Sequence, residues 1–177
     1  MLCLILGWQI PAHAEPGIAI DTASARIEHD IYLVDARLRY ELSEEARQAL
    51  DNGIALTFAV EVEFREQRAY LWDPVAADGR HWFRLEYHAL SRSYLVSNLT
   101  TKTRQSFPQL QEALDALGTV HNMAVVERNR VDANAHYQAR LSARLDIESL
   151  PAPLRPAAYF QSAWRIKSPS YQWALTP

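Results

Sequence analysis

Histidine is the residue most able to bind a metal ion or to act as a general base near neutral pH, and the chain has six. None forms a His-x-His or His-Glu-x-x-His motif, the spacings that place two imidazoles on one metal. His81 and His88 are an odd number of residues apart, so on a regular strand they face opposite sides. We therefore expect surface or edge histidines and no metal site.

A serine nucleophile needs a base and an orienting acid, which only tertiary structure brings together. The chain has no Gly-x-Ser-x-Gly motif, and its five glycines form no phosphate-cradling loop. Glu61 and Glu63 would point to the same side of a strand, a spacing typical of the solvated face of a half-buried sheet. The sequence thus predicts no catalytic residue and no cofactor.

Basic side chains near the C-terminal half offer a different chemistry, the binding of an anion or of an acidic partner. A hairpin with a three-residue loop at 131–133 would pair Val125 with Ala139 and place Arg128 opposite His136. The same face could instead be solvated, or could meet Glu61 and Glu63 across the sheet. Trp82, with the C-terminal aromatics, could form a docking patch or close the core. The candidate partner-binding residues are Arg128, Arg130, His136, Arg140, Arg144 and Trp82.

The N-terminus indicates export. Met1 to Leu6 is apolar, and Ala12-His13-Ala14 then forms the small-residue pattern of a signal-peptidase site. We expect residues 1–14 to be a signal peptide that is truncated at its start, because no Lys or Arg precedes Arg26; an ordinary N-terminal strand is the alternative. Cleavage would remove the only cysteine, Cys3, and leave a periplasmic chain without thiol chemistry.

Length and charge exclude other classes. The 177 residues suit one domain, which we place at 15–177. A formal net charge of -3 and a pI of about 6.1 predict no nucleic-acid partner. No apolar run approaches the roughly 20 residues that a transmembrane helix requires.

The strongest strand pattern is the segment 54–64, where large apolar residues alternate with small or acidic ones from Ile54 to Phe64. We predict that it is the central strand. The inward parity of neighbouring segments changes near Val34-Asp35, which predicts a β-bulge or a break, and near Ala89-Leu90, which predicts a second β-bulge. Residues 157–167 are typical of a last strand.

Two short helices are predicted between strands. Ser43 is a suitable N-cap and Gly53 a suitable end for the first. The second begins at 106–108 and ends at Gly118, with an apolar stripe along one side. Together with some seven strands that are mostly joined as hairpins, they predict a mainly β, antiparallel β-sandwich, immunoglobulin-like in general architecture.

Four stretches, in this order, resemble the uncharacterised domain-of-unknown-function family 4390, exported proteins of Gram-negative bacteria. They are 54–64 (IALTFAVEVEF), 87–96 (YHALSRSYLV), 106–114 (SFPQLQEAL) and 159–173 with its WRIKS core. The resemblance covers nearly all of the mature chain. It implies export and a single domain, and it brings no activity, ligand or catalytic residue with it.

The leading hypothesis is a non-enzymatic periplasmic module that binds an envelope or membrane protein. The second is a carrier of a small ligand or lipid, which requires a cavity between the sheets of roughly a few hundred Å³. The third is a hydrolase, which requires an acid, a histidine (His88 or His136) and a serine (Ser91 or Ser93) within hydrogen-bonding reach. The sequence does not determine the oligomeric state.

Overall fold

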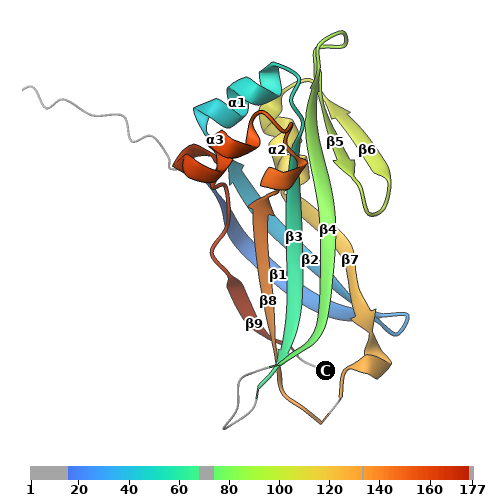
Figure 1. Ribbon diagram of the computed structural model, residues 1–177. Helices are drawn as coiled ribbons and strands as arrows, with labels where there is room; N and C mark the ends of the chain where they lie inside the picture. The colour runs from blue at the N-terminus through green and yellow to red at the C-terminus, as the bar shows by residue number, and fades with distance from the viewer. Residues whose placement is uncertain (1–15, 68–73, 133, 176–177) are drawn as a thin grey trace, which may run out of the picture.

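The computed structural model describes residues 16–67, 74–132 and 134–175 (Figure 1). Two antiparallel sheets pack face to face, one with the strand order β1-β2-β7 and one with the order β6-β5-β4-β3-β8-β9. The strands are β1 (Gly17–Glu28), β2 (Ile31–Glu41), β3 (Leu56–Glu66), β4 (Val75–His88), β5 (Ser93–Asn98), β6 (Thr103–Phe107), β7 (Thr119–Glu127), β8 (Tyr137–Leu145) and β9 (Tyr171–Leu175). The helices are α1 (Glu44–Asp51), α2 (Leu110–Leu117) and α3 (Arg155–Phe160), with 3-10 turns η1 (Arg128–Arg130), η2 (Ile147–Ser149) and η3 (Ser162–Trp164).

The prediction of a mainly β, antiparallel fold is confirmed. The two sheets lie one over the other, and the three helices gather at one end of them (Figure 1). None of the helices in the described part of the chain combines the length and apolar character that crossing a bilayer requires. The predicted signal peptide lies outside the described residues.

β3 is the central strand, as its alternation predicts. It pairs with β4 on one side and β8 on the other, and its side chains from Phe58 to Phe64 at even positions have no exposed surface. Tyr32 of β2 contacts Phe64 edge-on, at 5.4 Å between ring centroids. Tyr40 contacts Phe58 in the same way at 5.0 Å. Burial of these rings between the sheets therefore holds the sandwich together.

Both predicted helices exist. The side chain of Ser43 accepts a hydrogen bond from the backbone N–H of Ala46 at 3.1 Å, which caps α1. Gly53 follows the helix with a φ of +83°, a left-handed conformation that favours glycine. In α2 the buried residues are Ala113, Leu114 and Leu117. Its N-cap is Gln109, so this helix starts slightly later than predicted.

Neither predicted bulge changes the inward parity of its strand. In β2 the buried residues run without interruption from Tyr32 to Tyr40 at even positions. Register shifts do lie between Tyr32 and Leu33 and between Val34 and Ala36, but the extra residues belong to the partner strand, β7. Near Ala89 the parity changes because the chain turns there from β4 into β5.

The prediction of a hairpin with its loop at 131–133 is wrong. β7 pairs with β2, whereas β8 pairs with β3 and β9. The chain therefore passes from one sheet to the other between the end of β7 and the start of β8, and Val125 does not face Ala139. Local alternation cannot distinguish a hairpin partner from a distant strand of the same periodicity.

The predicted last strand is also wrong. Residues 155–160 form α3, in which Pro156 occupies one of the first helical positions, where a missing N–H costs nothing. Trp164 and Ile166 are buried beyond it. The last strand is β9, where the sequence analysis predicted no strand.

Position 118 requires glycine because there is no room for a side chain. Its backbone φ of -76° is one that any residue can adopt. A Cβ at this position would lie 2.0 Å from the carbonyl oxygen of Leu38. The backbone N–H of Leu38 donates to the carbonyl of Gly118 at 2.8 Å, so the end of α2 is joined directly to β2.

We predict that Gly118→Ala lowers the free energy of unfolding by about 1–3 kcal/mol, because the backbones must separate. It should also speed hydrogen exchange of the Leu38 amide. Gly53→Ala, in open space at positive φ, should cost about 1–2 kcal/mol through backbone strain and leave that amide protected. Unchanged exchange at Leu38 in Gly118→Ala would contradict the close contact.

The hydroxyl of Tyr40 is buried and makes no hydrogen bond with any described residue. Burial raises the pKa of this hydroxyl above its usual range. Tyr40→Phe should therefore raise the free energy of unfolding by about 1 kcal/mol, since it removes an unpaired polar atom and keeps the ring contact with Phe58. Tyr94→Phe is the control, because the Tyr94 hydroxyl donates to Asp51 at 3.2 Å and its loss should not stabilise. Urea unfolding measures both, and a destabilised Tyr40→Phe would refute the argument.

Candidate functional site

The outer face of the six-stranded sheet is the most highly charged surface that the strand pairing assembles. Because the even side chains of β3 enter the core, its odd side chains point outward. Glu61 consequently lies beside Arg80 of β4 and Ser142 of β8. Glu63 lies beside Asp78 and Arg140 in the next row.

Glu61 organises the centre of this face. Its carboxylate forms ion pairs with Arg80 and with Arg144, each at 2.7 Å. The Glu61 side chain is 20% exposed, whereas the two arginine side chains are 50% and 49% exposed. The arginines are therefore held in place on their inner side and still present surface to solvent.

An aromatic ring adjoins this ion-pair cluster. The guanidinium carbon of Arg80 lies 5.7 Å from the ring centroid of Trp82, within cation–π range. Trp82 and Arg144 flank Ala59 on its two sides, and Ala59 has no exposed surface. A small residue between two long ones lets both side chains lie flat across the strand.

Two further arginines on the same face lack a hydrogen bond on one nitrogen. The Nε atoms of Arg84 and Arg140 are buried and have no hydrogen-bond partner among the described residues. Arg84 lies between Thr57 and Ser97, and Arg140 lies between Glu63 and Gln172. A buried Nε cannot reach a docking partner, so contacts by these arginines would use the outer nitrogens of the guanidinium.

Strand pairing assigns more positive than negative side chains to the described part of this face, although the whole chain has a formal net charge of -3. The basic ones are Arg65, Arg80, Arg84, Arg104, Arg140, Arg144 and Lys167. The acidic ones are Glu61, Glu63, Asp78 and Glu86. We call these residues, with Trp82, the basic face.

The structure brings together half of the sequence-predicted partner residues. Trp82, Arg140 and Arg144 lie on the basic face, as described above. Arg128 and Arg130 lie in η1, and His136 is exposed in the segment that precedes β8, because β7 and β8 do not pair. Sequence alternation identified the outward parity of β8, but not the contribution of Arg80 and Arg84 from β4, which depends on strand pairing.

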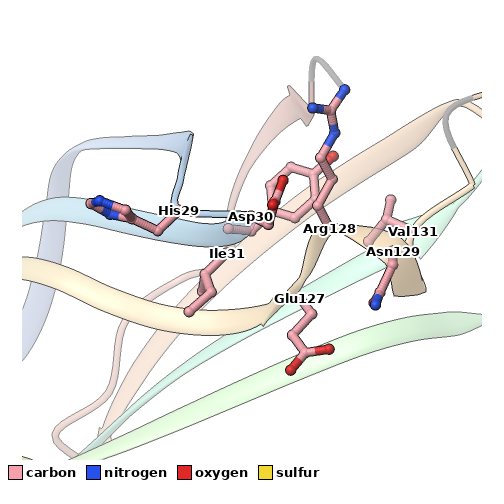
Figure 2. A pocket seen from close by; sticks show the side chains of 8 residues that line it. His29, Asp30, Ile31, Glu127, Arg128, Asn129 and Val131 are labelled. Carbon is pink, nitrogen blue, oxygen red and sulfur yellow. The ribbon is translucent and has the colours of Figure 1, made fainter.

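A pocket of about 590 Å³ lies beside η1 at the end of the β1–β2 hairpin. Its wall includes Tyr32, whose hydroxyl has a pKa raised by burial and lowered in part by Arg128. Figure 2 shows that His29, Glu127 and Arg128 point in different directions. Since its polar groups diverge, this hollow offers no common point at which they would hold one ligand.

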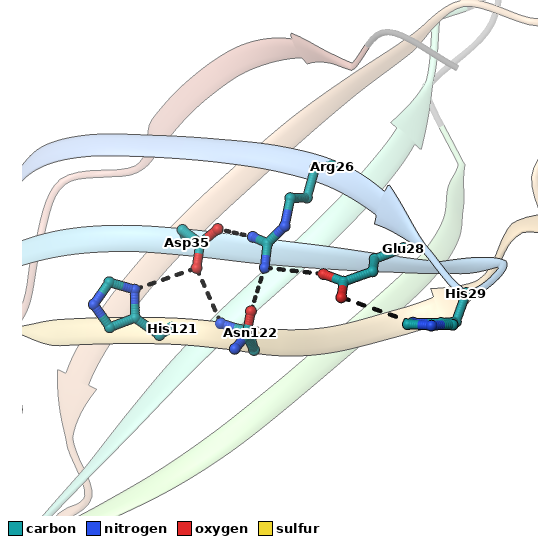
Figure 3. Close-up of polar contacts among 6 residues, drawn as sticks. All are labelled: Arg26, Glu28, His29, Asp35, His121 and Asn122. Atoms are coloured by element: carbon teal, nitrogen blue, oxygen red, sulfur yellow. Dashed lines mark hydrogen bonds and ion pairs between the residues drawn. The ribbon is translucent and has the colours of Figure 1, made fainter.

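A polar network crosses the outer face of the three-stranded sheet (Figure 3). The carboxylate of Asp35 accepts hydrogen bonds from the Arg26 side chain and from the backbone N–H of Asn122, the latter at 3.0 Å. It also contacts Nδ1 of His121 at 3.4 Å. Asn122 has a positive φ of 54° and lies in the irregular part of β7. Asp35 thus fixes the β7 bulge, which is a structural role.

The histidine and serine of the hydrolase hypothesis do meet. His88 Nδ1 lies 2.9 Å from Ser91 Oγ, which lies 2.8 Å from Ser93 Oγ. The backbone N–H of Ser91 also donates to His88 Nδ1 at 3.4 Å, so this ring nitrogen closes the exposed β4–β5 turn. Within the described residues no carboxylate bonds to His88, and the described chain has no group of three or more His, Cys, Asp or Glu suited to a metal.

We predict that Glu61→Gln lowers the free energy of unfolding by about 1 kcal/mol, because two arginines lose their shared carboxylate. Glu86→Gln is the matched control on the same face, and it should change the stability by less than about 0.5 kcal/mol. Thermal unfolding with a double-mutant cycle to Arg144→Gln gives the coupling. A coupling of zero would show that the ion pair contributes nothing.

The chain matches the model of a known protein family. A family model described as a domain of unknown function, DUF4390, matches residues 15–174, which covers nearly the whole chain. No curated protein and no solved structure matches this chain. The match spans both sheets and every strand of the basic face, and the chain therefore belongs to the DUF4390 family.

Proposed function

We propose that this protein is an exported, non-enzymatic binding module, and that the basic face docks an acidic segment of another protein of the cell envelope. The supporting observation is the Glu61 cluster, in which two half-exposed arginines and a tryptophan are fixed on a sheet face. Arginine and tryptophan are the residues enriched where partners bind tightly.

The geometry of the face favours a protein partner over a small anion. The arginines are spread across β3, β4 and β8 and are interleaved with carboxylates, so they do not converge on one point. An extended acidic segment can reach several of them in turn through bidentate pairs. The carboxylates within the face would repel acidic segments of the wrong spacing, which provides specificity.

Export is supported by the signal-like composition of the first 14 residues in the sequence. In an oxidising compartment a mature chain that lacks cysteine forms no wrong disulfides. A binding role is further supported because the described side chains combine no nucleophile, base and acid in one place.

The experiment places a photo-crosslinking residue at Ser142, which lies between Arg140 and Arg144 on β8, in living cells. Crosslinks should form to an envelope protein through a segment rich in Asp and Glu. The same residue placed at Asn129 in η1, away from the basic face, should not capture that segment. A captured segment without acidic excess would refute the proposal.

Charge reversal tests the arginines themselves. Arg140→Glu with Arg144→Glu should abolish the crosslink and weaken binding of the captured segment, made as a peptide, by about tenfold or more. Arg128→Glu with Arg130→Glu changes the net charge by the same amount, and it should leave the crosslink and the peptide affinity unchanged. Circular dichroism must show that both pairs are folded at the temperature of the binding assay, although the first pair should melt lower because Arg144 loses its ion pair with Glu61. Equal losses in the two variants would mean that only net charge matters.

A further inference from the structure

The two sheets differ in width, and the difference leaves a groove. β7 is an edge of the three-stranded sheet, so β5 and β6 have no strand opposite their inner face. α2 contacts these strands over part of their length. Beside it remains a hollow of about 320 Å³ between β4, β5 and β6 on one side and α2 and β7 on the other.

The lining of this groove has an apolar floor and a hydrogen-bonding rim. Phe83, Val96 and Val120 form the floor and are buried. The rim consists of hydroxyl, amide and imidazole side chains. These are Asn98, Thr101, Thr103, Gln105, Thr119, His81 and His121.

His81 is a polar residue of this lining whose ring has no hydrogen-bond partner among the described residues. It is on the inner face of β4, opposite Val60, and is only 7% exposed. Its ring makes no hydrogen bond to any described residue, and its one ring contact is with Phe83 at 6.5 Å. A buried imidazole without a partner is costly, unless water or a ligand in the groove completes its hydrogen bonds.

The groove carries little charge. Burial lowers the pKa of His81, so its ring is neutral at neutral pH and has one donor and one acceptor nitrogen. His121 is the other titratable group of the lining, and it contacts Asp35 on the outer face. Among the described residues, the lining includes no Lys, Arg, Asp or Glu that would compensate a charged ligand.

We propose that this groove binds an uncharged ligand about the size of one sugar ring, whose hydroxyl or amide groups pair with His81 and the rim while its apolar side lies on Phe83 and Val96. The volume is at the lower end of the range of small-molecule sites, about 300–1,000 Å³. Alternating apolar and hydroxyl faces are what a neutral sugar presents.

The test follows the ring resonances of His81 by NMR while glucose and N-acetylglucosamine are added in turn. At least one of them should shift these resonances saturably. Glucosamine and glucuronate have the same ring with a positive or a negative charge, and they should bind about tenfold more weakly because the groove cannot pair a charge. N-acetylglucosamine has an acetamido group where glucose has its 2-hydroxyl. The ratio of their two affinities therefore shows whether the rim binds an amide or a hydroxyl group better.

Two variants tie binding to the groove. Ala116→Leu adds bulk from α2 into the hollow and should abolish binding, whereas Gln111→Leu on the exposed side of the same helix should not. His81→Phe keeps a ring but loses both nitrogens, and calorimetry should show binding about tenfold weaker with no loss of melting temperature.

The proposal is overturned if neither neutral sugar shifts His81 at the highest soluble concentration. It is also overturned if Ala116→Leu, folded by circular dichroism, binds as well as the wild type. Its failure is separate from that of the docking proposal, because Arg140→Glu with Arg144→Glu should leave sugar binding unchanged.

Discussion

Packing of the even-numbered side chains of β3 against β2 is the constraint on which the other features depend. Phe58 and Phe64 each meet a tyrosine ring of the opposite sheet, and the residues between them are closed to solvent. Because strand side chains alternate, this burial forces Glu61 and Glu63 outward. The burial that builds the core therefore also determines which charged side chains reach the surface. A shift of the β3 register by one residue would expose the apolar side chains and bury the charged ones.

The unequal width of the sheets gives the molecule two different surfaces. On the outside, six paired strands form a broad face with Arg80, Arg144 and Trp82 near its centre. On the inside, the strands that β7 does not cover keep a recess, and no described residue forms a hydrogen bond with His81 there. Docking of a protein and binding of a small ligand would thus use opposite sides of one sheet and need not interfere.

Polar networks on the two outer faces have different roles. Asp35 binds side chains and a backbone N–H of neighbouring strands and fixes an irregular part of β7. Glu61 instead orders two arginines that remain half exposed. The first network satisfies groups of the fold itself, whereas the second holds positive charge at the surface, which would lower the entropy cost of the proposed docking.

The sequence by itself determined the local features, because each depends on neighbouring residues. The alternation of β3, the Ser43 cap, the apolar stripe of α2 and the outward parity of Arg140 and Arg144 all follow from spacing. Tertiary structure alone decided which strands pair. It separated β7 from β8, moved Arg128 away from the basic face and brought Arg80 and Trp82 beside Glu61. Strands of the same period are interchangeable in sequence, and only the shape of the whole core distinguishes their partners.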